Sequence, residues 1–198
     1  TRTVGGRQRG VGTVSEGNSF EFESVDSFVP GAVGEPGDRT FYLQARIGEQ
    51  VVSLRCEKQQ VGMLGRYLGQ LAEALGPVEP DRDVVGIIEP VQEQWTVGQL
   101  SVGVDEVNGK ILVTAEELLV EQVEIEGGDD LADDELEALL ETAGDLMGDP
   151  AEARFVLSAG QAVAFGERAE ELLAAGRPPC RLCGAPMDPE GHACPRWN

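Results

Sequence analysis

The chain has 198 residues, of which 41% are hydrophobic, and its formal net charge is −21 at pH 7. This hydrophobic content supports a folded domain with a core and excludes a wholly disordered protein. No stretch has the roughly 18 to 20 apolar residues of a membrane-spanning helix, and residues 1–19 lack the apolar centre of a signal peptide. We therefore expect a soluble, cytoplasmic protein that does not associate with membranes.

The charge is distributed unevenly along the chain. Fifteen acidic residues lie between Ile111 and Ala153 without one Lys or Arg, whereas residues 1–15 contain three arginines and no acid. A polyanionic surface repels nucleic acid phosphates, so nucleic acid binding would need a local basic patch and is not expected. We interpret the acidic run as a solvated, solubilising face. The alternative is a docking face for a basic protein partner.

The first half of the chain predicts strands followed by a helix. Residues 1–19 are rich in Gly and polar residues and predict a flexible arm. A β pattern begins at Phe20 and ends near Pro30, and turn residues then lead into a strand over 40–47. A short turn predicts a hairpin with a return strand over 51–56. An apolar stripe at helical spacing predicts a helix over 57–75 directly after that strand.

The second half repeats this order with one insertion. Residues 95–104 and 110–121 alternate in polarity and flank an Asn-Gly turn, which predicts a second hairpin. Residues 127–150 are acidic and carry leucines at helical spacing, which predicts an inserted amphipathic helix. Residues 153–157 return to a strand pattern. Ser158 and Gln161 then have the spacing of a capping box that opens a last helix through Ala175.

These elements predict an α+β fold, in which a mostly antiparallel sheet is backed by two long helices. The two helices align at an offset of 101 residues, so that Gln60 and Gly65 correspond to Gln161 and Gly166. This match indicates a possible internal β-β-α duplication, although any two amphipathic helices share such a stripe. The predicted organisation is an arm (1–19), an α+β domain (20–176, with the insertion 127–150) and a tail (177–198).

The tail has the residue spacing of a zinc knuckle. Cys180 and Cys183 are three apart and precede Gly184, which is typical of a tight turn that directs two thiolates at one cation. His192 and Cys194 are two apart, so in an extended strand their side chains emerge on the same face. The sequence therefore predicts a complete Cys₃His metal site formed by these four side chains.

A complete ligand set restricts the function that the metal can have. Four protein ligands leave no open position for water or substrate, so the sequence predicts structural zinc. The site would also occupy the only histidine of the chain, which disfavours catalysis by a Ser-His-Asp or Cys-His arrangement. The alternatives are a redox Cys-x-x-Cys pair, a disulfide, unrelated residues, or an iron site in which Cys56 is the fourth thiolate.

Other candidate residues lie around the first hairpin. The turn over residues 34–39 offers backbone N–H groups and Arg39, which could receive a phosphate or a carboxylate. The alternative is an ordinary loop between strands, because two acids of the turn disfavour an anion. Tyr42, Gln44 and Arg46 are expected to form an outward polar row. Cys56 is expected to be buried rather than reactive.

Two motifs carry a resemblance to a known family. They are Gly34-Glu-Pro-Gly-Asp-Arg-Thr-Phe-Tyr-Leu-Gln-Ala45 and Gly176-Arg-Pro-Pro-Cys180-Arg-Leu-Cys183-Gly, the latter followed by Asp188-Pro-Glu-Gly-His192-Ala-Cys194-Pro. The chain resembles the uncharacterised actinobacterial domain-of-unknown-function family 3090 from about Val25 onward. The resemblance implies a bacterial cytoplasmic protein. It brings no established activity, substrate or catalytic residue.

Three functions follow as hypotheses from the sequence. The leading one is a zinc-binding, non-catalytic protein-interaction or adaptor protein. The second is an enzyme or small-molecule-binding protein that uses a polar pocket between the sheet and the helices. The third, which the charge makes least favourable, is a nucleic-acid-binding module that uses the arginines of the arm and the tail.

Overall fold

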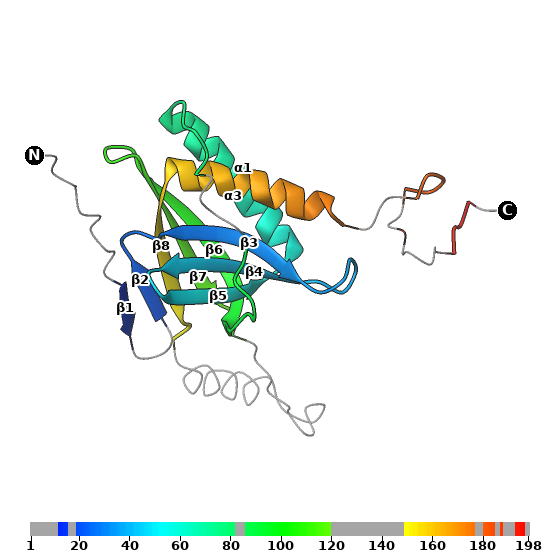
Figure 1. Ribbon diagram of the computed structural model, residues 1–198, viewed down its shortest axis with the longest axis horizontal. Coiled ribbons are helices and arrows are strands. Elements are labelled where there is room, and N and C mark those ends of the chain that lie inside the picture. Colours follow the sequence, from blue (N-terminus) through cyan, green and yellow to red (C-terminus); the bar gives the residue numbers. More distant parts are fainter. Residues whose placement is uncertain are drawn as a thin grey trace, which may run out of the picture.

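A computed structural model describes residues 12–15, 19–81, 86–119, 149–176, 180–184, 187 and 193–196. We call residues 19–176 of this set the body and those from 180 onward the tail. The described part contains eight strands and two helices (Figure 1). These are β1 (Gly12–Ser15), β2 (Ser19–Phe22), β3 (Ser27–Val33), β4 (Thr40–Ile47), β5 (Gln50–Cys56), α1 (Lys58–Leu75), β6 (Glu93–Asp105), β7 (Lys110–Glu117), β8 (Glu152–Ser158) and α3 (Ala159–Ala174).

All eight strands form one sheet, in the order β1-β2-β8-β7-β6-β5-β4-β3. Strands β3, β4 and β5 form one antiparallel meander, and β6, β7 and β8 form a second. Two strand pairs are parallel. The start of β6 pairs with β5, and β2 pairs with β8. Each parallel pair therefore joins the beginning of one half of the chain to the last strand of the other half.

The sheet must curl back on itself because its distant strands are close in sequence. Strands β2 and β3 are six positions apart in the sheet order, which in a flat sheet is about 29 Å at ~4.8 Å per strand. The five residue steps from Phe22 to Ser27 span at most about 18 Å. Phe28 of β3 accordingly packs against Phe155 of β8, with ring centroids 5.2 Å apart.

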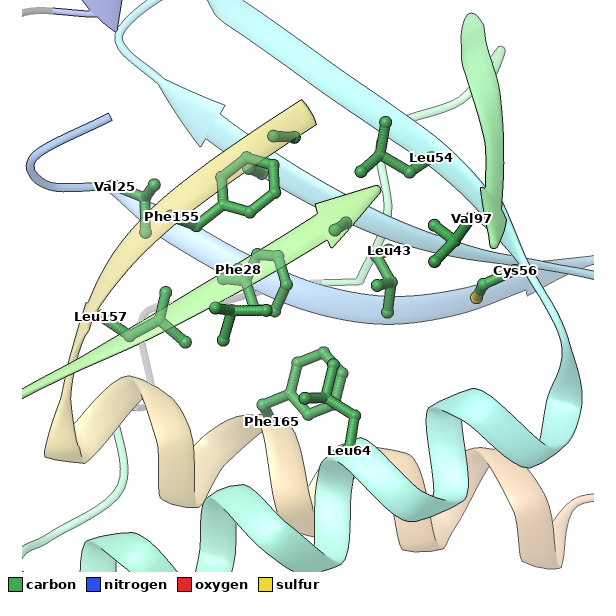
Figure 2. Packing of buried hydrophobic residues seen from close by; sticks show 14 of the residues in the cluster. Val25, Phe28, Leu43, Leu54, Cys56, Leu64, Val97, Phe155, Leu157 and Phe165 are labelled. Atoms are coloured by element: carbon green, nitrogen blue, oxygen red, sulfur yellow. The ribbon is translucent and has the colours of Figure 1, made fainter. Parts of the chain in front are cut away.

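The two helices cover one face of this curled sheet and cross each other (Figure 1). In Figure 2, Leu64 of α1 and Phe165 of α3 point from the helices toward the side chains of the sheet. The ring centroid of Phe165 lies 5.2 Å from that of Phe28, and Phe165 is fully buried. Burying a side chain of this size contributes roughly 1.5 to 3 kcal/mol, so this layer of contacts stabilises the body.

A matched pair of glutamines ties each helix to the other half of the chain. Gln60 and Gln161 each occupy the third position of their helix, and each side-chain oxygen accepts a hydrogen bond from the N-cap backbone N–H. The Nε2 of Gln60 donates to the carbonyls of Val97 and Gly98, where β6 changes from parallel to antiparallel pairing. The Nε2 of Gln161 donates to the Val25 carbonyl, at the break between β2 and β3.

The two helices cross at a pair of glycines. An added Cβ on Gly65 would lie 2.7 Å from the Cβ of Ala169, and one on Gly166 would lie 3.1 Å from the carbonyl oxygen of Gly65. These two glycines are the pair that aligns at the same offset as Gln60 and Gln161. Both glycines thus lie at the crossing, although the nearest atoms differ, and the two glutamines make corresponding contacts in both halves. This agreement supports the internal duplication more strongly than shared amphipathicity does.

The predicted α+β fold and its two helices are confirmed, and the structure adds two details. The predicted arm (1–19) includes β1, which pairs antiparallel with β2. Thr13 and Val14 favour a strand there, but four residues are too short to show alternation. The acidic insertion 127–150 falls largely outside the described residues. None of the described helices is long and apolar enough to cross a membrane.

Candidate metal centre

Three cysteines of the tail lie together in space. The Sγ atoms of Cys180, Cys183 and Cys194 are all within 4.8 Å of one another. The sulfurs of Cys180 and Cys194 are 3.9 Å apart. Zn–S bonds of ~2.3 Å in a tetrahedron place neighbouring sulfurs about 3.8 Å apart, so this spacing suits a common metal ion. These three thiols could therefore hold a metal.

Residues 180–184 form the first limb of the cluster, a tight turn that directs backbone N–H groups at sulfur. Gly184 donates its N–H to the carbonyl of Cys180 at 2.8 Å, and its φ of 76° lies in the left-handed region that favours glycine. The N–H of Leu182 points at the Sγ of Cys180, with 3.4 Å between nitrogen and sulfur. The Cys-x-x-Cys-Gly sequence forms this turn because Gly184 accepts the required φ.

The same N–H groups favour the ionised form of the thiol. Hydrogen bonds from the N–H groups of Cys183 and Leu182 lower the pKa of Cys180 below its usual value, and the neighbouring thiols add to the effect. A thiolate is the form that binds metal, so a lowered pKa reduces the proton competition at neutral pH.

Residues 193–196 form the second limb, which places Cys194 beside the first limb. Arg196 donates from Nη1 to the carbonyl of Leu182 at 3.3 Å, which links the two limbs two residues beyond Cys194. The fourth predicted ligand, His192, lies outside the described residues. The structure therefore brings together three of the four predicted ligands, and His192 remains a prediction.

Cys56 is not part of this cluster. It lies at the end of β5 within the hydrophobic core, and it is buried as the sequence predicts. Burial raises the pKa of the Cys56 thiol to about 12, so the thiol stays protonated near neutral pH. A four-thiolate iron site that includes Cys56 is therefore not formed.

The predicted polar row on β4 has a structural role at one position. Gln44 is buried. Its Nε2 donates to Ser53 and to the Ile88 carbonyl, and its Oε1 accepts from the Ile88 N–H at 2.7 Å. Tyr42 donates to a carboxylate oxygen of Glu93 at 3.4 Å. Gln44 thus fixes the segment after α1 onto the outer face of the sheet and is satisfied by those contacts.

Arg39 lies in a cavity of about 240 Å³ between the first hairpin loop and the two helices. Lys58 lines the same cavity, although the sequence prediction did not single it out. Its only sequence signal is its place as the first residue of α1, two residues after Cys56. That Lys58 and Arg39 line the same cavity depends on the packing of α1 and α3 against the sheet, which the sequence does not show.

Comparisons with known proteins identify a family for this chain. The family model described as "Protein of unknown function (DUF3090)" matches residues 20–194, which include the body from Phe20 onward and all three clustered cysteines. No curated protein and no solved structure shows significant similarity to the chain. The chain therefore belongs to the family of proteins of unknown function DUF3090.

Proposed function

We propose that this protein holds one structural zinc ion through Cys180, Cys183, His192 and Cys194, and that it acts as a non-catalytic interaction or adaptor protein. The observation that supports the metal is the 3.9 Å spacing of the Cys180 and Cys194 sulfurs, close to the edge of a zinc–thiolate tetrahedron. Two limbs of the tail supply the thiols. The ion would therefore join two segments that, among the described residues, are linked by the hydrogen bond from Arg196 to the Leu182 carbonyl.

Zinc is the metal whose preferences fit this ligand set. Thiolates together with one imidazole in a tetrahedral arrangement are typical structural zinc ligands, whereas an iron–sulfur site requires four thiolates in most cases. The contribution is large for a short segment, since structural zinc supplies roughly 10 to 16 kcal/mol of apparent binding free energy in finger peptides. This energy would offset the entropy of ordering a tail that is too short to form a core.

The proposed ligand set and the exposed side chains of the turn favour an interaction role over catalysis. A four-ligand site would leave no position for a substrate, and it would occupy the only histidine of the chain. Leu182 is 52% exposed on the turn, next to the exposed Arg181. An apolar side chain and an arginine on a rigid turn are suited to recognition of another protein.

The acidic run suggests the charge of that partner. Its fifteen acids contain no compensating Lys or Arg, and Glu116, Glu117, Asp149 and Glu152 belong to its described part. Such a surface would attract a basic protein at long range and repel nucleic acid. The proposed partner is therefore a protein with a basic surface, and the metal-held tail provides a second contact.

Native mass spectrometry tests the metal on protein that is purified without chelators. We expect one zinc ion per chain, loss of zinc in the double variant Cys180→Ser/Cys183→Ser, and full zinc content in Cys56→Ser as the matched control. Wild-type protein that carries no metal would overturn the proposal.

Cobalt substitution tests His192 as the fourth ligand. Replacing His192→Cys would raise the number of thiolates from three to four, so the thiolate-to-cobalt charge-transfer absorption should increase by about one third at unchanged stoichiometry. An unchanged spectrum would exclude His192 from the ligand set.

Affinity capture from native lysate tests the adaptor role with three baits. We expect the wild-type protein and Cys56→Ser to retain the same basic protein, with a yield that falls as salt rises because exposed charges are screened. The bait with Cys180→Ser/Cys183→Ser should retain less of it. Equal capture by all three baits would contradict a role for the tail in binding.

A further inference from the structure

The cavity that contains Arg39 lies between three parts of the fold. It has a volume of about 240 Å³. The loop between β3 and β4 forms one wall, the start of α1 the second, and the end of α3 the third. Its lining residues are Pro36, Gly37, Arg39, Phe41, Lys58, Leu172 and Gly176.

Among the described residues, two cations and no acid line this cavity, which is unusual for a chain of net charge −21. The two acids of the same loop, Glu35 and Asp38, are not among these lining residues. Within the part of the chain that the structure describes, neither Arg39 nor Lys58 forms an ion pair. Solvent-exposed cations of an acidic protein are readily paired with nearby carboxylates. Two unpaired cations that face one hollow therefore make a local positive site on a negative molecule.

The two cations approach the hollow from different elements. Arg39 comes from the hairpin loop just before β4, and Lys58 is the first residue of α1. The Nζ of Lys58 lies 3.6 Å from the position that a Cβ on Gly176 would take, so the ammonium reaches across to the end of α3. An ammonium has three donors, which can bind the oxygens of an anion in the hollow.

The walls and the size of the cavity restrict the ligand. Phe41 and Leu172 provide apolar contacts, whereas Arg39 offers a planar fork of donors and Lys58 a point charge. A volume of about 240 Å³ lies below the ~300 to 1,000 Å³ of typical pockets for drug-sized ligands, so a small anion with a few carbon atoms suits it best.

We propose that this cavity binds the phosphate group of a small phosphate monoester. A phosphate monoester carries a charge of about −1.5 to −2 near pH 7, which matches the two cations, and its oxygens accept bidentate bonds from arginine. Phe41 and Leu172 would contact the short carbon skeleton. The site is separate from the cysteine cluster, so it goes beyond the proposed zinc function and does not depend on it.

NMR titration of the full-length protein tests the site with four probes: inorganic phosphate, glycerol 3-phosphate, lactate and uncharged glycerol. We expect saturable shifts of the Gly37 and Gly176 amide signals with both phosphates, tighter binding of glycerol 3-phosphate, and no shift with glycerol. Tighter binding of inorganic phosphate would assign the site to the free ion and overturn the monoester. A lactate probe that binds more tightly than either phosphate would overturn the phosphate class.

Matched variants test whether phosphate binding depends on the two cations. Arg39→Gln and Lys58→Gln should each weaken glycerol 3-phosphate binding by about tenfold or more, the effect expected of a lost charge-assisted hydrogen bond. Arg66→Gln and Lys110→Gln remove the same charges elsewhere and should leave the affinity unchanged. Cys180→Ser should also leave it unchanged, which separates this site from the zinc proposal. Equal affinities in Arg39→Gln and in the wild type would overturn the site.

Discussion

The body and the tail are held together by different interactions. The body buries a continuous cluster of apolar side chains between the sheet and the two helices, whereas the described tail brings three thiols together around a tight turn. Leu182, the large apolar side chain of that turn, is half exposed. Burial of apolar surface therefore stabilises the body, and ligand bonds to a metal would stabilise the tail. The two parts should respond to different perturbations.

The strongest test of this separation is a cavity in the core. Phe165 is fully buried and stacks on Phe28. Phe165→Ala should lower the free energy of unfolding by about 3 to 5 kcal/mol, because it removes buried contacts and leaves a void. Urea denaturation followed by circular dichroism measures the loss, and native mass spectrometry should find the zinc content unchanged. A parallel loss of zinc would show that the tail depends on the body.

The next largest effect is expected at the helix-start glutamines. Gln161 is buried, so Gln161→Ala leaves the Val25 carbonyl and the Ser158 N–H without that partner, at a cost of about 1 to 3 kcal/mol. Gln60 occupies the matched position but is partly exposed, and water can replace its bonds. Gln60→Ala is the matched control and should cost less. Equal losses of unfolding free energy in the two variants would show that the difference in burial between Gln161 and Gln60 has no effect on stability.

A glycine pair on α1 tests the helix crossing. Gly65→Ala places a Cβ 2.7 Å from the Cβ of Ala169, and such overpacking costs about 1 to 3 kcal/mol, partly offset by better helix propensity. Gly69→Ala meets nothing within 4 Å and should stabilise the helix by up to ~1 kcal/mol. Thermal unfolding should therefore shift in opposite directions for the two variants. A rise in both would indicate that the helices can separate without cost.

Removal of the metal should affect the tail and leave the body nearly unchanged. Chelation is expected to abolish the protection of the Leu182 and Gly184 amides from hydrogen exchange, since the turn is short and exposed. The free energy of unfolding of the body, measured by denaturant titration, should change by less than about 1 kcal/mol. A midpoint shift as large as that of Phe165→Ala would contradict the separation.

Thiol labelling gives the smallest and most local test. At pH 8, iodoacetamide should label Cys180, Cys183 and Cys194 in metal-free protein and spare Cys56, whose thiol has a pKa of about 12 because it is buried. The folded state holds that proton more tightly than the unfolded state does. The contribution of Cys56 to stability is therefore complete below about pH 9 and falls as the pH rises toward 12. Early labelling of Cys56 would indicate local opening of β5.

Local signals in the sequence predict most of the elements but not how the sheet closes. The hairpin turns, the capping box at Ser158 and the helical stripes identify β4, β5, α1, β6, β7, β8 and α3 within a few residues. The parallel pairing of Phe20 with Ala153 joins residues more than a hundred positions apart, and no local pattern encodes it. The cysteine cluster is predictable because the Cys-x-x-Cys-Gly spacing is typical of a turn that brings two thiols together. The shared cavity of Arg39 and Lys58 depends on tertiary packing, which no local pattern encodes.

The exchanged glutamine contacts have a consequence for how the two halves can exist. The glutamine at each helix start donates to a backbone carbonyl of the opposite half, and the last strand of each half pairs in parallel with a strand near the beginning of the other. One half alone would therefore have an open parallel edge and a side-chain amide without its carbonyl partner. It would be complete only as a symmetric homodimer of two copies. If the chain arose by duplication, its ancestor was a dimer, and the fusion converted a subunit interface into a single core.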